Sequence, residues 1–191
     1  KRLVEKAGEI SQSPFYVDDS PSRTVSEIAA AARRIVRSDG RLGLIVIDYL
    51  QLIEPDNARD PRQEQVARIA RRLKGLAREL QVPVLCLAQL NRQAEDSRDH
   101  RPRLSHLRES GAIEQDADIV MFIHREEYYH HGEVDEELAG KAEVIIAKQR
   151  NGPVGIAELL WEKEFTRFHD RAPERFDEFD SFNQNPIPTD F

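Results

Sequence analysis

The sequence is poor in the residues that form disulfide bonds or structural metal sites. It contains one cysteine, one methionine and one tryptophan in 191 residues. The single Cys86 can form no disulfide within the chain, and no Cys/His spacing typical of a zinc site is present. Because Cys86 lies in the apolar run of residues 84–88, we interpret it as a buried thiol in a reducing compartment.

Long apolar runs and an excess of positive charge are also missing. No apolar stretch approaches the ~20 residues that span a bilayer, and no signal-peptide pattern opens the chain. The net charge is −7, the wrong sign for a protein that coats nucleic acid with a broad basic face, so any nucleic-acid binding must be local. The length suits one ordinary domain with a real core. The chain begins Lys1-Arg2 without an initiator methionine, and we interpret it as a fragment or a processed product.

The most informative stretch is residues 42–48, Leu-Gly-Leu-Ile-Val-Ile-Asp. A strand that is apolar on both faces is expected inside a parallel sheet covered by helices on each side. Asp48 falls at the carboxyl end of this strand, which is the edge where open α/β sheets bind ligands, and a carboxylate there can hold Mg²⁺ and nucleotide phosphates. On this run alone, the simpler interpretation is that Asp48 caps the following turn.

The flanking segments predict helices that pack on this strand. Thr24 and Glu27 form a capping-box pattern before an apolar stripe that ends at Asp39-Gly40. Asp60-Pro61 predicts an N-cap followed by proline at the first helical position, and the second helix runs to about Leu80. Strand, helix and the next apolar run, residues 84–88, then form a right-handed crossover unit.

The second strand ends in Gln89, at the same edge of the sheet as Asp48. A neutral amide at this place can sense the γ-phosphate of a nucleotide by hydrogen bonding, although Gln89 alone is also consistent with an ordinary strand end. A third strand is predicted over residues 119–123, and its end could join the same edge.

The remaining segments predict connections, a hairpin and a tail. Residues 15–17 are expected to form a short strand, and residues 91–103 a long polar loop. Residues 126–140 are expected to form a mobile excursion. Residues 141–148 and 156–161 are expected to pair as an antiparallel hairpin across Asn151-Gly152-Pro153.

Four segments, taken in order, resemble the motor domain of the DnaB-type replicative helicases. Residues 44–53 are similar to the Walker B segment of that family, and residues 88–92, Ala-Gln-Leu-Asn-Arg, to its third motif. Residues 101–118 resemble its long fourth motif. Residues 147–153, Ala-Lys-Gln-Arg-Asn-Gly-Pro, match the segment that carries the subunit-interface lysine and arginine.

The resemblance implies an α/β fold, a RecA-like mostly parallel sheet flanked by helices with a carboxyl-terminal antiparallel hairpin. Residues 1–169 would form a partial RecA-like ATPase domain, containing the part from Walker B onward, and residues 170–191 an acidic flexible tail. Asp48 would be the acid that organises water around Mg²⁺, and Gln89 the amide that links the γ-phosphate to the DNA-binding loops.

The resemblance also implies DNA contacts and a composite active site. Arg108, Glu109 and Gly111 would lie on a loop that holds one phosphate of single-stranded DNA through main-chain N–H groups, which suits an acidic domain. Lys148 and Arg150 would reach the γ-phosphate bound by the neighbouring subunit. As an isolated pattern, these two charges at a strand end are more simply solvated.

The implied activity is ATP-driven 5′-to-3′ translocation on single-stranded DNA and duplex unwinding by a homohexamer that uses ATP and Mg²⁺. Primase and a helicase loader would bind through parts of the parent protein that this chain does not contain, and the protein would be cytoplasmic with no membrane partner.

The sequence departs from the family in three ways. It contains no P-loop motif, Gly-x-x-x-x-Gly-Lys-Ser/Thr. The nearest candidate is Gly140-Lys141, which is followed by Ala142. The family's catalytic glutamate is also missing. His106 stands where the family usually has an acid. We therefore expect the isolated chain to be inactive. The alternatives are a recombinase or clock-type RecA-like ATPase, which would lack the 108–118 pattern, and a truncated non-catalytic module for DNA binding or ring assembly.

Overall fold

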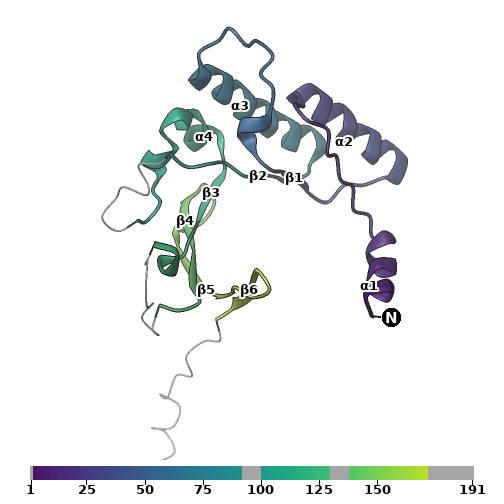
Figure 1. Cartoon of the computed structure of the whole chain (residues 1–191). Coiled ribbons are helices and arrows are strands. Elements are labelled where there is room, and N and C mark those ends of the chain that lie inside the picture. Colours follow the sequence, from purple (N-terminus) through teal and green to yellow (C-terminus); the bar gives the residue numbers. More distant parts are fainter. Residues whose placement is uncertain (1, 92–99, 130–137, 172–191) are drawn as a thin grey trace, which may run out of the picture. The chain divides into compact units, whose positions relative to one another are not determined.

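The computed structural model describes residues 2–91, 100–129 and 138–171 (Figure 1). The chain folds as two compact units, one formed by residues 1–91 with 105–117 and the other by residues 92–104 with 118–191. The predicted division into a domain over residues 1–169 and a tail over 170–191 stays a prediction, because residues 172–191 lie outside the described part. Among the described residues, no helix combines the length and apolarity needed to cross a membrane.

Helix α2 (Val25–Asp39) of the first unit begins and ends where the sequence predicts. The Glu27 N–H donates to the Thr24 hydroxyl (3.3 Å), and the Glu27 carboxylate accepts from the Thr24 N–H (2.8 Å), which completes the capping box. Gly40 ends the helix in the left-handed region at φ 77°, and its N–H donates to the Val36 carbonyl. Local chemistry alone therefore sets both ends of this helix.

Helix α3 (Arg62–Leu80) begins one residue later than the sequence predicted. Pro61, not Asp60, is the N-cap, and it has no side-chain cap bond. The Asp60 carboxylate is instead held by Arg68 (2.9 Å) and by the side-chain amide of Asn57 (2.7 Å). The buried stripe of α3 consists of Val66, Ile69, Leu73 and Leu76.

Strands β1 (Ile45–Ile47) and β2 (Val84–Cys86) pair in parallel, with Ile45 opposite Val84 and Ile47 opposite Cys86. Helix α3 is their crossover, and α2 and α3 lie on the same side of the strands (Figure 1). Ile47, Val84 and Cys86 pack against a buried cluster made of Val25, Leu50, Ile53, Val66, Ile69 and Leu73. The predicted strand–helix–strand unit is confirmed.

The other face of the strand pair corrects the expectation of helices on both sides. Val46 is 56% exposed, Leu85 43% and Leu87 44%. Successive side chains of a strand point to opposite faces, so these residues alternate with the packed ones. Within the described residues, helices cover one face of β1 and β2 and leave an apolar second face open to solvent.

The second unit contains a four-stranded antiparallel sheet in the order β3-β4-β5-β6. Its strands are β3 (Ile119–His124), β4 (Lys141–Gln149), β5 (Gly155–Glu162) and β6 (Arg167–Asp170). The predicted hairpin is β4 and β5. The predicted third strand, β3, pairs antiparallel with β4 and does not extend the parallel pair, so its end does not join Asp48 and Gln89 on one sheet.

The shorter elements complete the description. Helix α1 (Arg2–Ser11) precedes residues 15–17, which do not form the predicted strand: Phe15 is 73% exposed and Val17 75%. The 3₁₀ helix η1 (Leu50–Leu52) follows β1, and η3 (Leu104–Ser110) leads directly into α4 (Gly111–Asp116). A further 3₁₀ helix, η4 (Glu126–Tyr129), follows β3, and residues 92–99 and 130–137 of the predicted loop and excursion lie outside the description.

Candidate functional site

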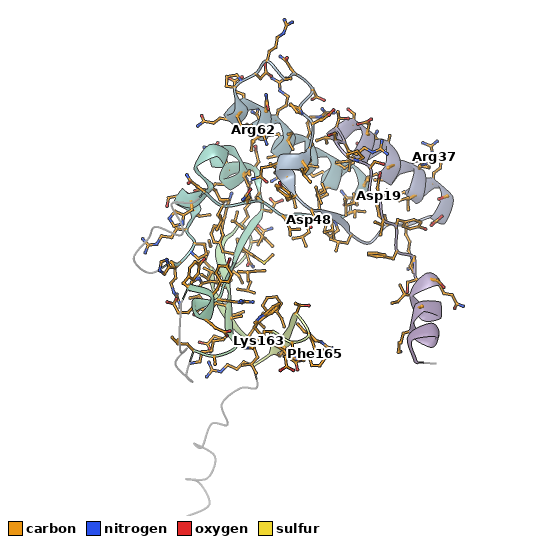
Figure 2. All side chains as sticks on the ribbon, in the orientation of Figure 1. Asp19, Arg37, Asp48, Arg62, Lys163 and Phe165 are labelled. Carbon is orange, nitrogen blue, oxygen red and sulfur yellow. The ribbon has the colours of Figure 1, made fainter. Side chains whose placement is uncertain are left out.

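Asp48 follows β1 directly, whereas Gln89 lies three residues after the end of β2, which is shorter than the predicted strand over residues 84–88. Asp48 follows Ile47 directly and is exposed beside the strand pair (Figure 2). The pairing continues past β2, because the Leu87 N–H donates to the Ile47 carbonyl (2.9 Å) and the Leu50 N–H donates to the Leu87 carbonyl (2.8 Å). Asp48 and Gln89 therefore lie at the same end of the strand pair, where backbone hydrogen bonds still join the two segments.

The chemistry at Asp48 suits one kind of metal site. Among the described residues, no group of three or more His, Cys, Asp or Glu side chains is arranged to hold a metal ion. A single exposed carboxylate does not make a protein cage, but it fits Mg²⁺, which keeps several waters and binds through one or two carboxylates plus substrate phosphates.

Cys86 is the last residue of β2, and its surroundings disfavour the reactive thiolate form. Burial raises the pKa of the thiol to about 12. The thiolate is the reactive species, so a thiol with this pKa stays protonated and inert near neutral pH. The sequence predicted a buried thiol, and in the structure Cys86 is half-buried.

The segment predicted to bind DNA is helical rather than an open loop. η3 and α4 follow one another without a break from Leu104 to Asp116, with a kink at Leu107, which is buried. The backbone of Arg108 and Glu109 lies in the last turns of η3, and Gly111 is the first residue of α4.

Gly111 does not need a glycine conformation in this chain. The glycines with positive φ among the described residues are Gly40 and Gly140. A Cβ built on Gly111 would have no heavy atom within 4 Å. The steric argument for glycine at this position therefore applies only if a ligand approaches the backbone.

Helix α4 is held on α3 at its carboxyl end, whereas Gly111 is its first residue. Lys74 of α3 donates to the Asp116 carbonyl at the carboxyl end of α4 (3.0 Å), and Arg71 lies 3.7 Å from the Asp116 carboxylate. Ile113 packs against the buried cluster of the first unit. A cation at a helix carboxyl end also interacts favourably with the helix dipole. The candidate DNA segment is thus anchored to the same helix that connects β1 and β2.

Lys148 and Arg150 lie near the end of β4, in the second unit. Lys148 is on the strand opposite Val120, and Arg150 follows the last residue of β4 at the turn of the hairpin. The Arg150 N–H donates to the Asp118 carbonyl (2.9 Å), and Arg150 Nε lies 3.4 Å from Asp118 Oδ1. The structure thus brings Asp48, Gln89 and the 108–111 segment into one unit and places Lys148 and Arg150 in the other.

Residues that sequence reasoning missed also contribute to this region. Gln51 hydrogen-bonds to the backbone of Gln89, and the Asn91 N–H donates to the His106 carbonyl (3.2 Å). Both residues are part of recognisable motifs, but neither has the charge or nucleophilicity by which a candidate is picked from sequence.

The fold and the strand-end site define a class: a RecA-like ATPase domain. Two solved structures match the chain with a TM-score of 0.81 and 42% identity over 90% of its length. One is the ATPase domain of G40P, of which the chain covers 60%; the other is a DnaB-like replicative helicase described with its interactions with primase, of which it covers 40%. The RecA-like expectation is confirmed.

The family follows from the sequence comparisons. The model of the DnaB-like helicase C-terminal domain matches residues 1–170, and the chain belongs to this family. It is 49% identical over 178 residues to the replicative DNA helicase DnaB of Geobacillus stearothermophilus and 49% identical over 180 residues to the replicative DNA helicase DnaC of Bacillus subtilis. Each alignment covers 93% of this chain, and the chain spans 38% of the length of either relative.

Proposed function

We propose that the full-length protein containing this chain is a homohexameric replicative DNA helicase that couples ATP hydrolysis to 5′-to-3′ translocation on single-stranded DNA and to duplex unwinding. The observation that supports this most directly is the position of Asp48 directly after β1 and of Gln89 three residues after its parallel partner β2, where hydrogen bonds still join the two segments. In α/β sheets this edge is the ligand-binding edge, and an acid beside a neutral amide suits a nucleotide phosphate with its metal.

The two residues take different roles in this proposal. Asp48 would hold Mg²⁺ through its water ligands, and the ion would supply positive charge beside the phosphates of ATP. Gln89 hydrogen-bonds to the γ-phosphate or to the attacking water, so that its position changes when the phosphate leaves. Because the backbone after Gln89 is bonded to η3 through Asn91 and His106, such a change has a short route to the 108–111 segment.

The DNA and the neighbouring subunit complete the site. Arg108, Glu109 and Gly111 contact one backbone phosphate of single-stranded DNA, and Lys148 and Arg150 reach the γ-phosphate held by the next subunit of the ring. Primase and a helicase loader bind elsewhere on the full-length protein. The printed description of one solved relative, a replicative helicase with its interactions with primase, supports a primase partner.

The decisive experiment compares the full-length protein with its Asp48→Asn variant on forked DNA. The wild type is expected to unwind a fork with a 5′ single-stranded tail and to leave a fork with only a 3′ tail intact. The variant should retain nucleotide binding and lose ATPase and unwinding. If the wild type hydrolysed no ATP yet bound DNA, the helicase proposal would be refuted and the non-catalytic module favoured.

A further inference from the structure

Gln51 occupies a short turn between the two strands of the candidate site. It is the middle residue of η1. Leu50, directly before it, is 3% exposed, and Ile53, two positions after it, is 4% exposed. Both apolar residues belong to the buried cluster beneath the strands. The turn is therefore fixed to the core, and the polar side chain between them is only partly exposed.

The carboxamide of Gln51 binds both backbone polar groups of Gln89. Its Nε2 donates to the Gln89 carbonyl (3.3 Å), and its Oε1 accepts from the Gln89 N–H (3.4 Å). Within a sheet, a neighbouring strand would satisfy such groups, but β2 ends at Cys86. The Gln51 side chain thus makes the two hydrogen bonds to Gln89 that the backbone of a neighbouring strand would make in a continuous sheet.

We call the two hydrogen bonds from the Gln51 carboxamide to Gln89 the Gln51 clamp, and helix α3 holds the backbone of Gln51 in place. Arg62, the first residue of α3, donates from Nη2 to the Gln51 carbonyl (3.3 Å). The backbone of Gln51 is tied to the helix and its side chain to Gln89. The carboxamide orientation follows from its two partners, since only one orientation gives a donor to the carbonyl and an acceptor to the N–H.

From this arrangement we infer that Gln51 is a positioning residue that fixes the backbone of Gln89 and thereby aims the Gln89 side chain. In an extended chain, the backbone orientation decides to which side a side chain points. A rotation of the backbone at Gln89 would therefore turn its side-chain carboxamide away from the phosphate. The inference rests on the proposed function of Gln89 and adds a residue that does not touch the nucleotide.

The clamp also lies on the route from the strand edge to the candidate DNA segment. Two residues after Gln89, the Asn91 N–H donates to the His106 carbonyl of η3. With Gln51 attached, a shift of Gln89 on phosphate release is passed along the backbone to η3. Without this attachment, the backbone around Gln89 is free to absorb the shift. Loss of the clamp should therefore weaken the coupling between DNA binding and ATP hydrolysis more than it weakens nucleotide binding.

The test uses Gln51→Leu in the full-length protein, which removes both hydrogen bonds while keeping a side chain of similar size. The matched control is Gln81→Leu, which removes a side-chain bond to the Arg78 carbonyl (2.8 Å) near the opposite, amino-terminal end of β2. Measurements are kcat and KM for ATP, with and without single-stranded DNA. Gln51→Leu should lower kcat about 10- to 100-fold, the size expected when a positioned group is displaced, with KM nearly unchanged and little stimulation by DNA left. Gln81→Leu should behave as wild type.

A double-mutant cycle separates positioning from general damage. If Gln51 acts through Gln89, adding Gln51→Leu to Gln89→Ala should cause no further loss of kcat. Additive losses, or an unchanged DNA-stimulated rate in Gln51→Leu, would overturn the inference while leaving the proposed function intact. Normal ATPase in Gln89→Ala alone would instead refute the role proposed for Gln89, and the inference with it.

A second variant covers the case in which Gln51→Leu fails to fold. Gln51→Glu keeps the shape and the acceptor for the Gln89 N–H but replaces the donor by a carboxylate oxygen that repels the Gln89 carbonyl. The same kinetic split is expected from this variant. A wild-type ratio of DNA-stimulated to basal rates in Gln51→Glu would count against the clamp.

Discussion

Arg150→Ala in the full-length protein tests the composite active site most sharply, because the ion pair that Arg150 forms with Asp118 in its own subunit is largely exposed. The guanidinium pairs with Asp118 at 3.4 Å, and the two side chains are 46% and 62% exposed. An exposed pair of this kind contributes at most about 1 kcal/mol, or about fivefold in an equilibrium. The backbone bond from Arg150 to the Asp118 carbonyl is unaffected by the substitution.

A role in the neighbour's active site predicts a much larger effect. An arginine that stabilises phosphoryl transfer from outside contributes about 10³-fold or more to kcat. Arg150→Ala should therefore bind ATP almost normally and turn over about 10³-fold more slowly. Asp118→Asn is the matched control: it removes the partner of Arg150 within the subunit and should change kcat less than about fivefold.

Complementation between two inactive variants decides whether Arg150 acts in trans. Asp48→Asn disables the site in its own subunit, whereas Arg150→Ala would disable the site of its neighbour. In a randomly mixed ring, about a quarter of the head-to-tail interfaces would combine an intact Asp48 with an intact Arg150, and part of the ATPase activity should return.

Two results would refute this reasoning. Arg150→Ala with kcat within about fivefold of the wild type would mean that Arg150 does not stabilise phosphoryl transfer in the neighbouring subunit. A severe defect that mixing with Asp48→Asn never relieves, in rings shown to exchange subunits, would place the action of Arg150 within its own subunit.

Three further predictions concern the candidate DNA segment, the isolated chain and the thiol. In the full-length protein, Gly111→Val should weaken single-stranded DNA binding without unfolding the unit, because no heavy atom of another part of the chain lies within 4 Å of the new Cβ. Glu109→Gln should change the affinity little, and neither variant should alter base preference, as fluorescence anisotropy with labelled oligonucleotides across a salt series can show. Unchanged binding by Gly111→Val together with tighter low-salt binding by Glu109→Gln would instead favour simple attraction by nearby arginines. The isolated 191-residue chain should release no phosphate from ATP, and steady release that Asp48→Ala abolishes would contradict this. Since the pKa of Cys86 is raised from 9.0 to about 12, its alkylation near pH 8 should be about 10³-fold slower in the folded chain than in urea, as followed by mass spectrometry, and equal rates would mean that β2 opens freely.

The parts of the fold that follow from local chemistry could be predicted from the sequence. Thr24 and Glu27 satisfy each other's backbone and side-chain groups, and Gly40 adopts the left-handed conformation that ends a helix. The Asn151-Gly152 turn lies within the hairpin of β4 and β5 as expected. Each of these signals needs only residues that are close in the chain, so no tertiary contact can overrule it easily.

The errors occurred where distant residues compete for the same group. Asp60 has the chemistry of an N-cap, but Arg68 and Asn57 hold its carboxylate, and the helix begins after Pro61. The unbroken apolar run that ends at Asp48 predicted a strand covered on both faces, but among the described residues helices cover only one face, and Val46 is 56% exposed on the other. Residues 15–17 have strand propensity, but a strand needs a partner, and propensity says nothing of whether one is there.

The candidate site shows the same division between what a motif reveals and what it hides. Asp48 and Gln89 could be picked from sequence because each has a side chain suited to a phosphate or its metal, and each ends an apolar run. Gln51 has the same side chain as Gln89 and lies three positions after Asp48, yet its amide is used on the backbone of Gln89 rather than on a ligand. Sequence does not distinguish these two uses, because a carboxamide offers the same donor and acceptor to a peptide group as to a phosphate or water. What distinguishes them is whether a peptide group at that point lacks a strand partner, and that depends on where β2 ends relative to η1 in space.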